Sequence, residues 1–148
     1  MISPKTWNDF GISIKDRIPE LKGFIKVKEE AHLNKDLQGH SEFPVLVFVD
    51  LSAGVTGANA DASWDKHTAL AFILDEADSP SKGGKENELN SDELTHGITE
   101  QFKSILKSKK DGTGNPCSFL HRLEYNTIFT DPVYNYAKCN GWAVTFEF

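Results

Sequence analysis

The chain has 148 residues and a mass of 16.5 kDa, the size of one domain that can bury a sizeable core without disulfides. Its composition, 39% hydrophobic and 26% charged, excludes the disordered class, because enough apolar surface is present to form a core. A net charge of −6 argues against the clustered Lys and Arg of a face that grips nucleic acid regardless of sequence. The sequence contains neither a signal peptide nor an apolar run of membrane-spanning length, so we expect a cytosolic origin and no membrane partner.

The first elements predicted are a helix and a peripheral strand. Ser3 can cap the first amides of a helix and Pro4 loses no hydrogen bond at its first position, so we expect a helix from there to about Arg17. Residues 24–29 alternate in polarity, which predicts an amphipathic strand at the edge of a sheet. The polar segment 30–42 is predicted to be a loop.

Two apolar runs, residues 43–50 and 68–74, predict the centre of the sheet. Both are rich in β-branched and aromatic residues without polar interruption, which is typical of strands covered on both faces. Sequential strands usually lie side by side, so we expect these two to be neighbours. Alternation places the side chains of the first run on two faces: Val45, Val47 and Val49 on one, Leu46 and Phe48 on the other.

Two long loops are predicted, at about residues 51–66 and 76–90. The first is built from small residues, among them Gly54 and Gly57, and an insertion of this length inside a compact domain is either mobile or functional. The second is rich in carboxylates. Its simplest interpretation is a solvated loop, and the alternative is an acidic surface presented to a partner or to a DNA-lined channel.

The remaining chain is predicted to contain one helix and two strands. A helix capped by Asn90 or Ser91 carries a periodic apolar face. A long strand is expected over residues 118–129, and a closing strand over 142–148. Turns are expected at Asp131-Pro132 and Asn140-Gly141. The predicted fold is therefore a single α+β domain over residues 1–148, with one mixed, mostly antiparallel sheet of about five strands packed against two helices.

No constellation of residues identifies a chemistry. Five histidines lack metal-binding spacings, and neither Cys117 nor Cys139 has a neighbouring base, so we expect inert thiols and no cofactor. The one group that could converge on a cation is Asp61, Asp65 and His67. This group supports an alternative, a small metal-dependent hydrolase or nuclease, although a solvated loop is the commoner outcome for such a cluster.

Contact with other subunits is the other role open to the loops. A large aromatic residue in a loop of small residues, such as Trp64, is either an interface anchor or a contact that fastens the loop to the core. The candidates for an interface or for the lining of a channel are Trp64, Asp75, Glu76, Asp78, Glu86 and Glu88.

The order of elements resembles that of the tail terminator and tail-completion (head–tail joining) proteins of long-tailed bacteriophages. The resemblance is carried by residues 25–27, 43–48, 67–74 and 141–148, and the insertion at 52–62 departs from it. It implies a virion protein, assembled in the host cytoplasm, that forms a ring of usually six copies without catalytic residues. Such a ring caps the tail tube and joins it to the neck connector. DNA passes through its lumen without specific binding, and an acidic lumen would repel phosphate. An adaptor of a tail-like secretion machine is an open alternative.

Overall fold

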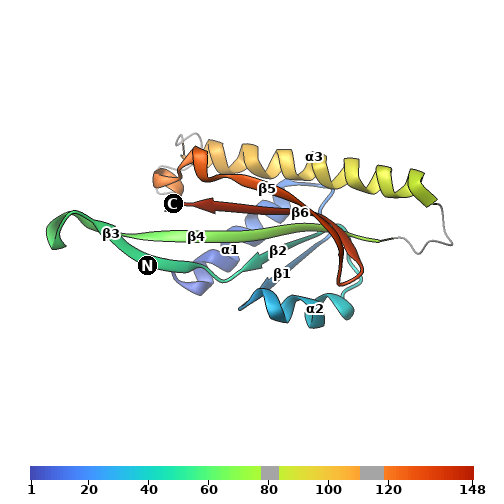
Figure 1. Ribbon diagram of the computed structural model, residues 1–148, viewed down its shortest axis with the longest axis horizontal. Coiled ribbons are helices and arrows are strands. Elements are labelled where there is room, and N and C mark those ends of the chain that lie inside the picture. The colour runs from blue at the N-terminus through green and yellow to red at the C-terminus, as the bar shows by residue number, and fades with distance from the viewer. Residues whose placement is uncertain (78–83, 111–118) are drawn as a thin grey trace.

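The computed structural model (Figure 1) describes residues 1–77, 84–110 and 119–148, with the side chains of 84–87 excluded. It contains six strands in one mixed sheet and three α-helices, which confirms the predicted α+β class. The strand order is β1-β2-β4-β6-β5, with β3 paired to the far end of β4. Among the strands that the structure describes, only β1 and β2 run parallel. The helices are α1 (Pro4–Arg17), α2 (Glu30–Gln38) and α3 (Gly84–Lys110), and the strands are β1 (Gly23–Val27), β2 (Val45–Val49), β3 (Ser52–Gly57), β4 (Ser63–Glu76), β5 (Phe129–Tyr136) and β6 (Cys139–Glu147).

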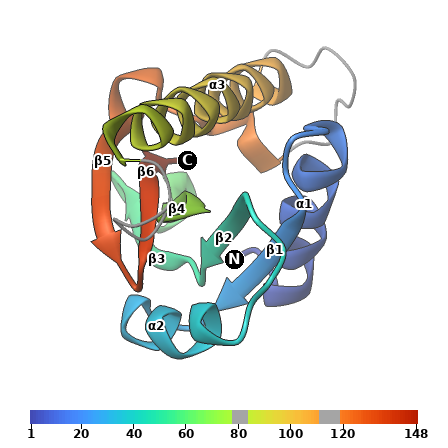
Figure 2. The same cartoon turned by 90° about the vertical axis from the view of Figure 1, so that its right-hand side faces the viewer.

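Helices cover both faces of the sheet: α1 and α3 lie on one, and α2 lies on the other (Figure 2). All five residues of β2 are buried, and their side chains alternate between the two faces as predicted. Leu46 and Phe48 pack under α1 and α3, whereas the three valines pack against α2. The predicted first helix is also confirmed, and Ser3 caps it by accepting a hydrogen bond from the amide of Thr6 at 3.1 Å.

The prediction of a loop at residues 51–66 is wrong. Those residues form β3, a short 3-10 turn η1 (Ala60–Ala62) and the first part of β4, because β4 continues well past the sheet centre and gives β3 a partner. The second predicted loop, residues 76–90, is wrong in its last part, since α3 already begins at Gly84. Residues 78–83 lie outside the described chain.

Three further predictions need correction. Segment 30–42 contains α2, whose Leu33 and Leu37 lie one turn apart and are buried. The long strand expected over 118–129 is wrong, because the described residues 119–127 contain two 3-10 turns, η2 (Phe119–Arg122) and η3 (Tyr125–Thr127), and β5 begins only at Phe129. The turns expected at Asp131-Pro132 and Asn140-Gly141 are strand residues, and the chain reverses between them, where Asn135, Ala137 and Lys138 adopt positive φ. Among the described helices, none is long and apolar enough to cross a membrane.

Candidate functional site

The feature that stands apart from the core is the hairpin of β3 and the first part of β4, residues 52–66, which we call the arm. Within the arm the register runs from Gly54 opposite Lys66 to Gly57 opposite Ser63, and Ser52 pairs with Thr68 where β4 enters the sheet. Figure 1 shows it leaving the left side of the molecule, beyond both chain ends. No residue of β3 is buried, and the side chain of Val55 is 76% exposed. The arm is therefore a two-stranded ribbon without a core of its own.

The tip of the arm is a fixed turn. Gly57 has φ +142°, and a Cβ at this position would lie 2.2 Å from the carbonyl oxygen of Ala62, so glycine is required there. Asn59 Oδ1 accepts hydrogen bonds from the amides of Asp61 and Ala62 at 3.1 and 3.0 Å. The sequence of small residues that predicted a loop thus encodes a tight connection between two strands.

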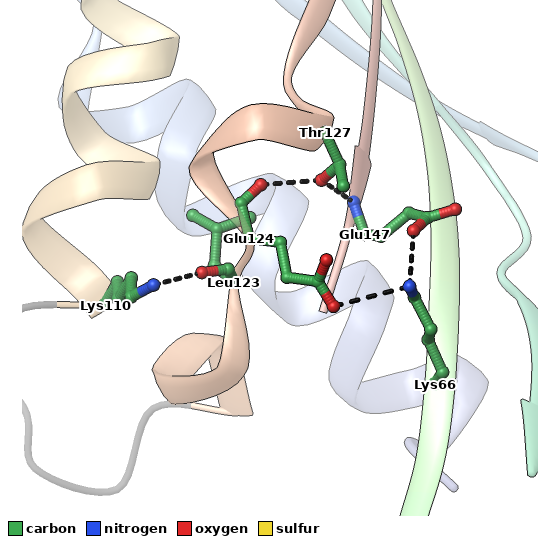
Figure 3. A network of polar contacts seen from close by, with 6 residues as sticks. All are labelled: Lys66, Lys110, Leu123, Glu124, Thr127 and Glu147. Atoms are coloured by element: carbon green, nitrogen blue, oxygen red, sulfur yellow. Dashed lines mark hydrogen bonds and ion pairs between the residues drawn. The ribbon is translucent and has the colours of Figure 1, made fainter. Parts of the chain in front are cut away.

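The base of the arm is held by a network of polar contacts (Figure 3). Lys66 Nζ lies 2.7 Å from a carboxylate oxygen of Glu147 and 3.3 Å from one of Glu124, and these hydrogen bonds raise the pKa of Lys66. Thr127 Oγ1 donates to the carbonyl oxygen of Glu124 at 2.6 Å and accepts from the amide of Glu147 at 2.9 Å. At the far side of the network, Lys110 donates to the carbonyl oxygen of Leu123. The arm is therefore tied to the end of β6 and, through η2 and η3, to α3.

Trp64 lies on the arm and outside the core. Its side chain is 43% exposed, and the guanidinium carbon of Arg122 lies 4.7 Å from its ring centroid, a cation–π contact. Cross-strand partners share a face of a ribbon. Trp64 opposes Thr56, whereas Val55 opposes Asp65, so Trp64 and Val55 lie on opposite faces. Both faces of the arm therefore expose an apolar side chain.

The three candidate cation ligands are not brought together. Asp61 is exposed in η1 at the tip, while Asp65 lies in β4 and pairs with the amino group of Met1, which lowers the pKa of the carboxyl. Among the residues that the structure describes, no group of three or more His, Cys, Asp and Glu side chains is arranged to hold a metal ion.

His67, the third candidate, belongs to the core. Its side chain is 4% exposed, its ring stacks on Phe148 with centroids 5.1 Å apart, and Nε2 accepts a hydrogen bond from the amide of Ile2 at 3.3 Å. Burial lowers its pKa. His67 thus joins the N-terminal segment to Phe148, the residue that follows β6.

The acidic candidates lie at the other end of β4 from the arm. Asp75 Oδ2 accepts a hydrogen bond from Ser91 Oγ at 2.7 Å, and Glu76 is exposed beside it. Both line an open cleft of about 550 Å³ between β4 and α3. Glu88 is exposed on the first turns of α3, while Asp78 and the side chain of Glu86 lie outside the described residues. The described candidates for an interface, Trp64 on the one hand and Asp75, Glu76 and Glu88 on the other, therefore lie at two separate ends of the molecule.

Sequence reasoning missed several exposed apolar side chains, notably Val55 on the arm and Leu89 on α3 (60% exposed), together with Phe129 (61% exposed) and Tyr134 (75% exposed) on the edge strand β5. The sequence around Val55 did contain an indication of a strand, since the pair Val55-Thr56 between two glycines is typical of a short strand in a hairpin. Comparisons with models of protein families, with curated proteins and with solved structures found no match for the chain.

Proposed function

We propose that this chain is a structural subunit of a bacteriophage tail, of the tail terminator or tail-completion type. In this proposal six copies form a ring that caps the tail tube and joins it to the neck connector. The chain acts by binding other subunits, in the virion, and does not catalyse a reaction.

The arm is the observation that carries this proposal. A single two-stranded hairpin is at best marginally stable in water, because it has no apolar face to bury. This arm has a fixed tip, a clamped base and an exposed apolar side chain on each face, Val55 and Trp64. Burial against a neighbouring copy would give both faces a partner and would repeat around a ring, because a contact between two different surfaces generates a ring when its rotation closes.

The positions of exposed carboxylates support the proposal of a lumen through which DNA passes. Exposed Glu76 and Glu88 and the partly buried Asp75 lie at the end of β4 opposite the arm, on a chain whose net charge is −6. Carboxylates that line a lumen repel phosphate and keep passing DNA from binding. We therefore propose that this end, rather than the arm, faces the DNA.

Two variants at one position test the proposal. Val55→Asp places a charge where contact with a neighbour is expected, and Val55→Thr is the matched control because it keeps a β-branched side chain of similar size. Native mass measurement and negative-stain images should show rings for the wild type and for Val55→Thr, and none for Val55→Asp. Both variants should fold, because the side chain is 76% exposed in the single chain.

Rings should also bind subunits of the phage tail tube. A wild type that neither forms rings nor binds tube subunits would overturn the proposal, and binding only to the tube of a secretion machine would favour the adaptor alternative.

A further inference from the structure

Strand β3 of the arm has a free edge. Along its other edge it pairs with β4, and no second partner is found among the strands that the structure describes. The backbone bonds of His67 show which groups lie on the free edge. His67 and Phe148 donate to each other's carbonyl oxygens at 2.7 and 3.1 Å, so the N–H and C=O of His67 point toward β6. Successive residues of a strand point these groups to opposite sides, so those of Lys66 point toward β3 and meet its partner Gly54.

The alternate residues of β3 therefore point their backbone N–H and C=O groups away from β4. These residues are Ala53, Val55 and, at the end of the strand, Gly57. All three are exposed, so these groups face solvent in the single chain. Such an edge is a template for a further strand, because its donors and acceptors recur at the spacing that a second strand presents.

β3 lacks the features that protect sheet edges in natural proteins, which are charged side chains, proline, bulges and very short strands. Its sequence Ser52–Gly57 contains no charged residue and no proline, and its register with β4 has no shift. The edge strand β1 differs, because it has only five residues. The carbonyl oxygen of Val27 accepts from the amide of Asp50 at 2.9 Å and so points to the β2 side. By alternation, only Phe24 and Lys26 of β1 point their backbone groups outward.

The free edge of β5 is interrupted by a proline. Pro132 lies opposite Trp142 of β6. Trp142 is an even number of residues before Phe148 and so points its backbone groups the same way, toward β4. Pro132 therefore occupies a position of β5 that points outward, where its missing N–H removes a donor. A register shift follows between Val133 and Tyr136. Among the edges that the structure describes, β3 is thus the one that can accept a strand along its whole length.

A second β3 strand fits this edge. When two copies run antiparallel with Val55 at the centre, Val55 lies opposite Val55 of the other copy and Ala53 lies opposite Gly57, so each outward-pointing residue meets another. The nearest charged residue in the row of Val55 is Asp65, its partner on β4. Three strand spacings, about 14 Å, separate the two copies of Asp65, and each is already paired with the amino group of Met1. The pairing therefore brings no like charges of the two arms into contact.

The position of the arm leaves room for this partner. The arm extends beyond both chain ends (Figure 1), and antiparallel pairing sends the two arms in opposite directions, so the two folded bodies lie at opposite ends of the joined sheet. A lone two-stranded hairpin is at best marginally stable, whereas three or more strands with an apolar face are stable. The joined arms form a four-stranded sheet, β4-β3-β3-β4, with Val55 of each copy side by side at its centre. A second copy thus supplies both the backbone partner and the apolar contact that the arm lacks.

We propose that β3 pairs antiparallel with β3 of a second copy of this chain, across a two-fold axis at Val55. The ring contact of the proposed function buries the faces of the arm, whereas this contact uses its edge. The inference therefore does not rest on the ring, and the contact joins two copies whether or not rings form.

The test reads the register of the two strands by cross-linking. In the proposed pairing Gly54 lies opposite Thr56 of the other copy, with Cα atoms about 4.5 Å apart, a separation that a disulfide spans. Two copies of the same residue, at either position, are about 8 Å apart, which is too far for a disulfide. An equimolar mixture of the full chains Gly54→Cys and Thr56→Cys, at about 100 μM with glutathione disulfide as the oxidant, should therefore link at least about tenfold faster than either variant alone.

Both cysteine variants should fold. A Cβ at Gly54 would meet no atom within 4 Å, and cysteine is close to threonine in size. Circular dichroism checks this expectation. Peptide mapping identifies the linked positions and separates them from any link through Cys117 or Cys139.

A proline at the centre of the strand tests the backbone bonds. The N–H of Val55 points away from β4, so Val55→Pro removes a donor of the proposed contact and no hydrogen bond between β3 and β4. Added to both cysteine variants, Val55→Pro should slow the link at least about tenfold. Val55→Thr is the matched control, because it keeps the N–H and a β-branched side chain, and it should leave the rate unchanged.

A mixture that links no faster than either cysteine variant alone, or a Val55→Pro pair that links as fast as the Val55→Thr pair, would overturn the proposal. If rings form but this link does not, the edge pairing fails alone. If the link forms but rings do not, the ring proposal fails alone.

Discussion

The indole ring of Trp7 stacks on the phenyl ring of Phe48, with centroids 4.4 Å apart and planes inclined by 24°. The indole Nε1–H also donates a hydrogen bond of 2.9 Å to the carbonyl oxygen of Val49. Trp7 and Phe48 are each at most 1% exposed. One side chain of α1 thus fixes the helix to the central strand through both packing and a buried hydrogen bond.

Two substitutions of Trp7 should destabilise the chain to different extents. Trp7→Phe keeps an aromatic ring but leaves the buried carbonyl of Val49 without its donor, which should lower the free energy of unfolding by about 1–3 kcal/mol. Trp7→Ala also opens a cavity and should lower it by about 3–5 kcal/mol. Urea denaturation followed by circular dichroism measures both. A Trp7→Phe variant as stable as the wild type would contradict the role assigned to the hydrogen bond.

The clamp at the base of the arm should affect local order more than global stability. Lys66→Met removes contacts with Glu124 and Glu147 that are partly exposed, so the unfolding free energy should change little. Amide hydrogen exchange over residues 52–65 should become faster, because the arm has no core to hold it.

Lys5→Met is the control for that experiment. It removes an exposed ion pair between Lys5 and Asp9, which both lie on α1, far from the arm in sequence. It should leave exchange in the arm unchanged. Equal exchange in the arm for Lys66→Met and the wild type would show that the network does not hold the arm.

His67 should make stability depend on pH. Burial lowers its pKa in the folded chain below the ordinary value of 6.5, so the unfolded chain binds a proton more readily. Stability should therefore fall as the pH decreases through about 6.5, before carboxylates begin to titrate. His67→Gln should flatten the dependence of unfolding free energy on pH between about 7.5 and 5.5. If the unfolding free energy of His67→Gln depends on pH as steeply as that of the wild type, His67 is not the group responsible for the dependence.

Cys139 should be unreactive in the native chain. Its side chain is 2% exposed, and burial raises its pKa to about 11. Only about one thiol in a thousand is then ionised at pH 8, and the thiolate is the reactive form. Iodoacetamide followed by peptide mapping should modify Cys139 only after unfolding, with Cys117 read separately on its own peptide. Native modification of Cys139 at the rate of an unfolded peptide would contradict this placement.

The centre of the fold could be predicted because its residues carry strong patterns. The uninterrupted run at Val45–Val49 implied a strand covered on both faces, and the cap at Ser3 fixed the start of α1. By contrast, α2 has only two buried apolar residues, Leu33 and Leu37, and its N-cap Glu29 makes no side-chain capping bond. Such a weakly amphipathic helix forms because the sheet offers an apolar face to cover, and that face is visible only in three dimensions.

Two misread segments show the same dependence on tertiary contacts. Leu120 and Leu123 are both buried, and their spacing of three residues fits a 3-10 turn as well as a strand with a bulge. The arm was misread because Val55-Thr56 is a short strand signal among small residues, and the strand at Ser52–Gly57 gains its partner only through the continuation of β4 past the sheet centre. Only part of the candidate site could therefore be predicted. Trp64 was a candidate from the sequence, whereas its contact with Arg122 and the exposure of Val55 are visible only in the structure.

We propose that the arm binds a neighbouring copy of the chain in a closed ring. The most direct measurement is the native mass of the purified chain together with class averages of negatively stained particles, for the wild type and for Val55→Asp. Closed six-membered rings are expected for the wild type, and Val55→Asp should abolish them. A wild type that remains a folded single copy at every concentration, or a Val55→Asp variant that still forms the same rings, would contradict it.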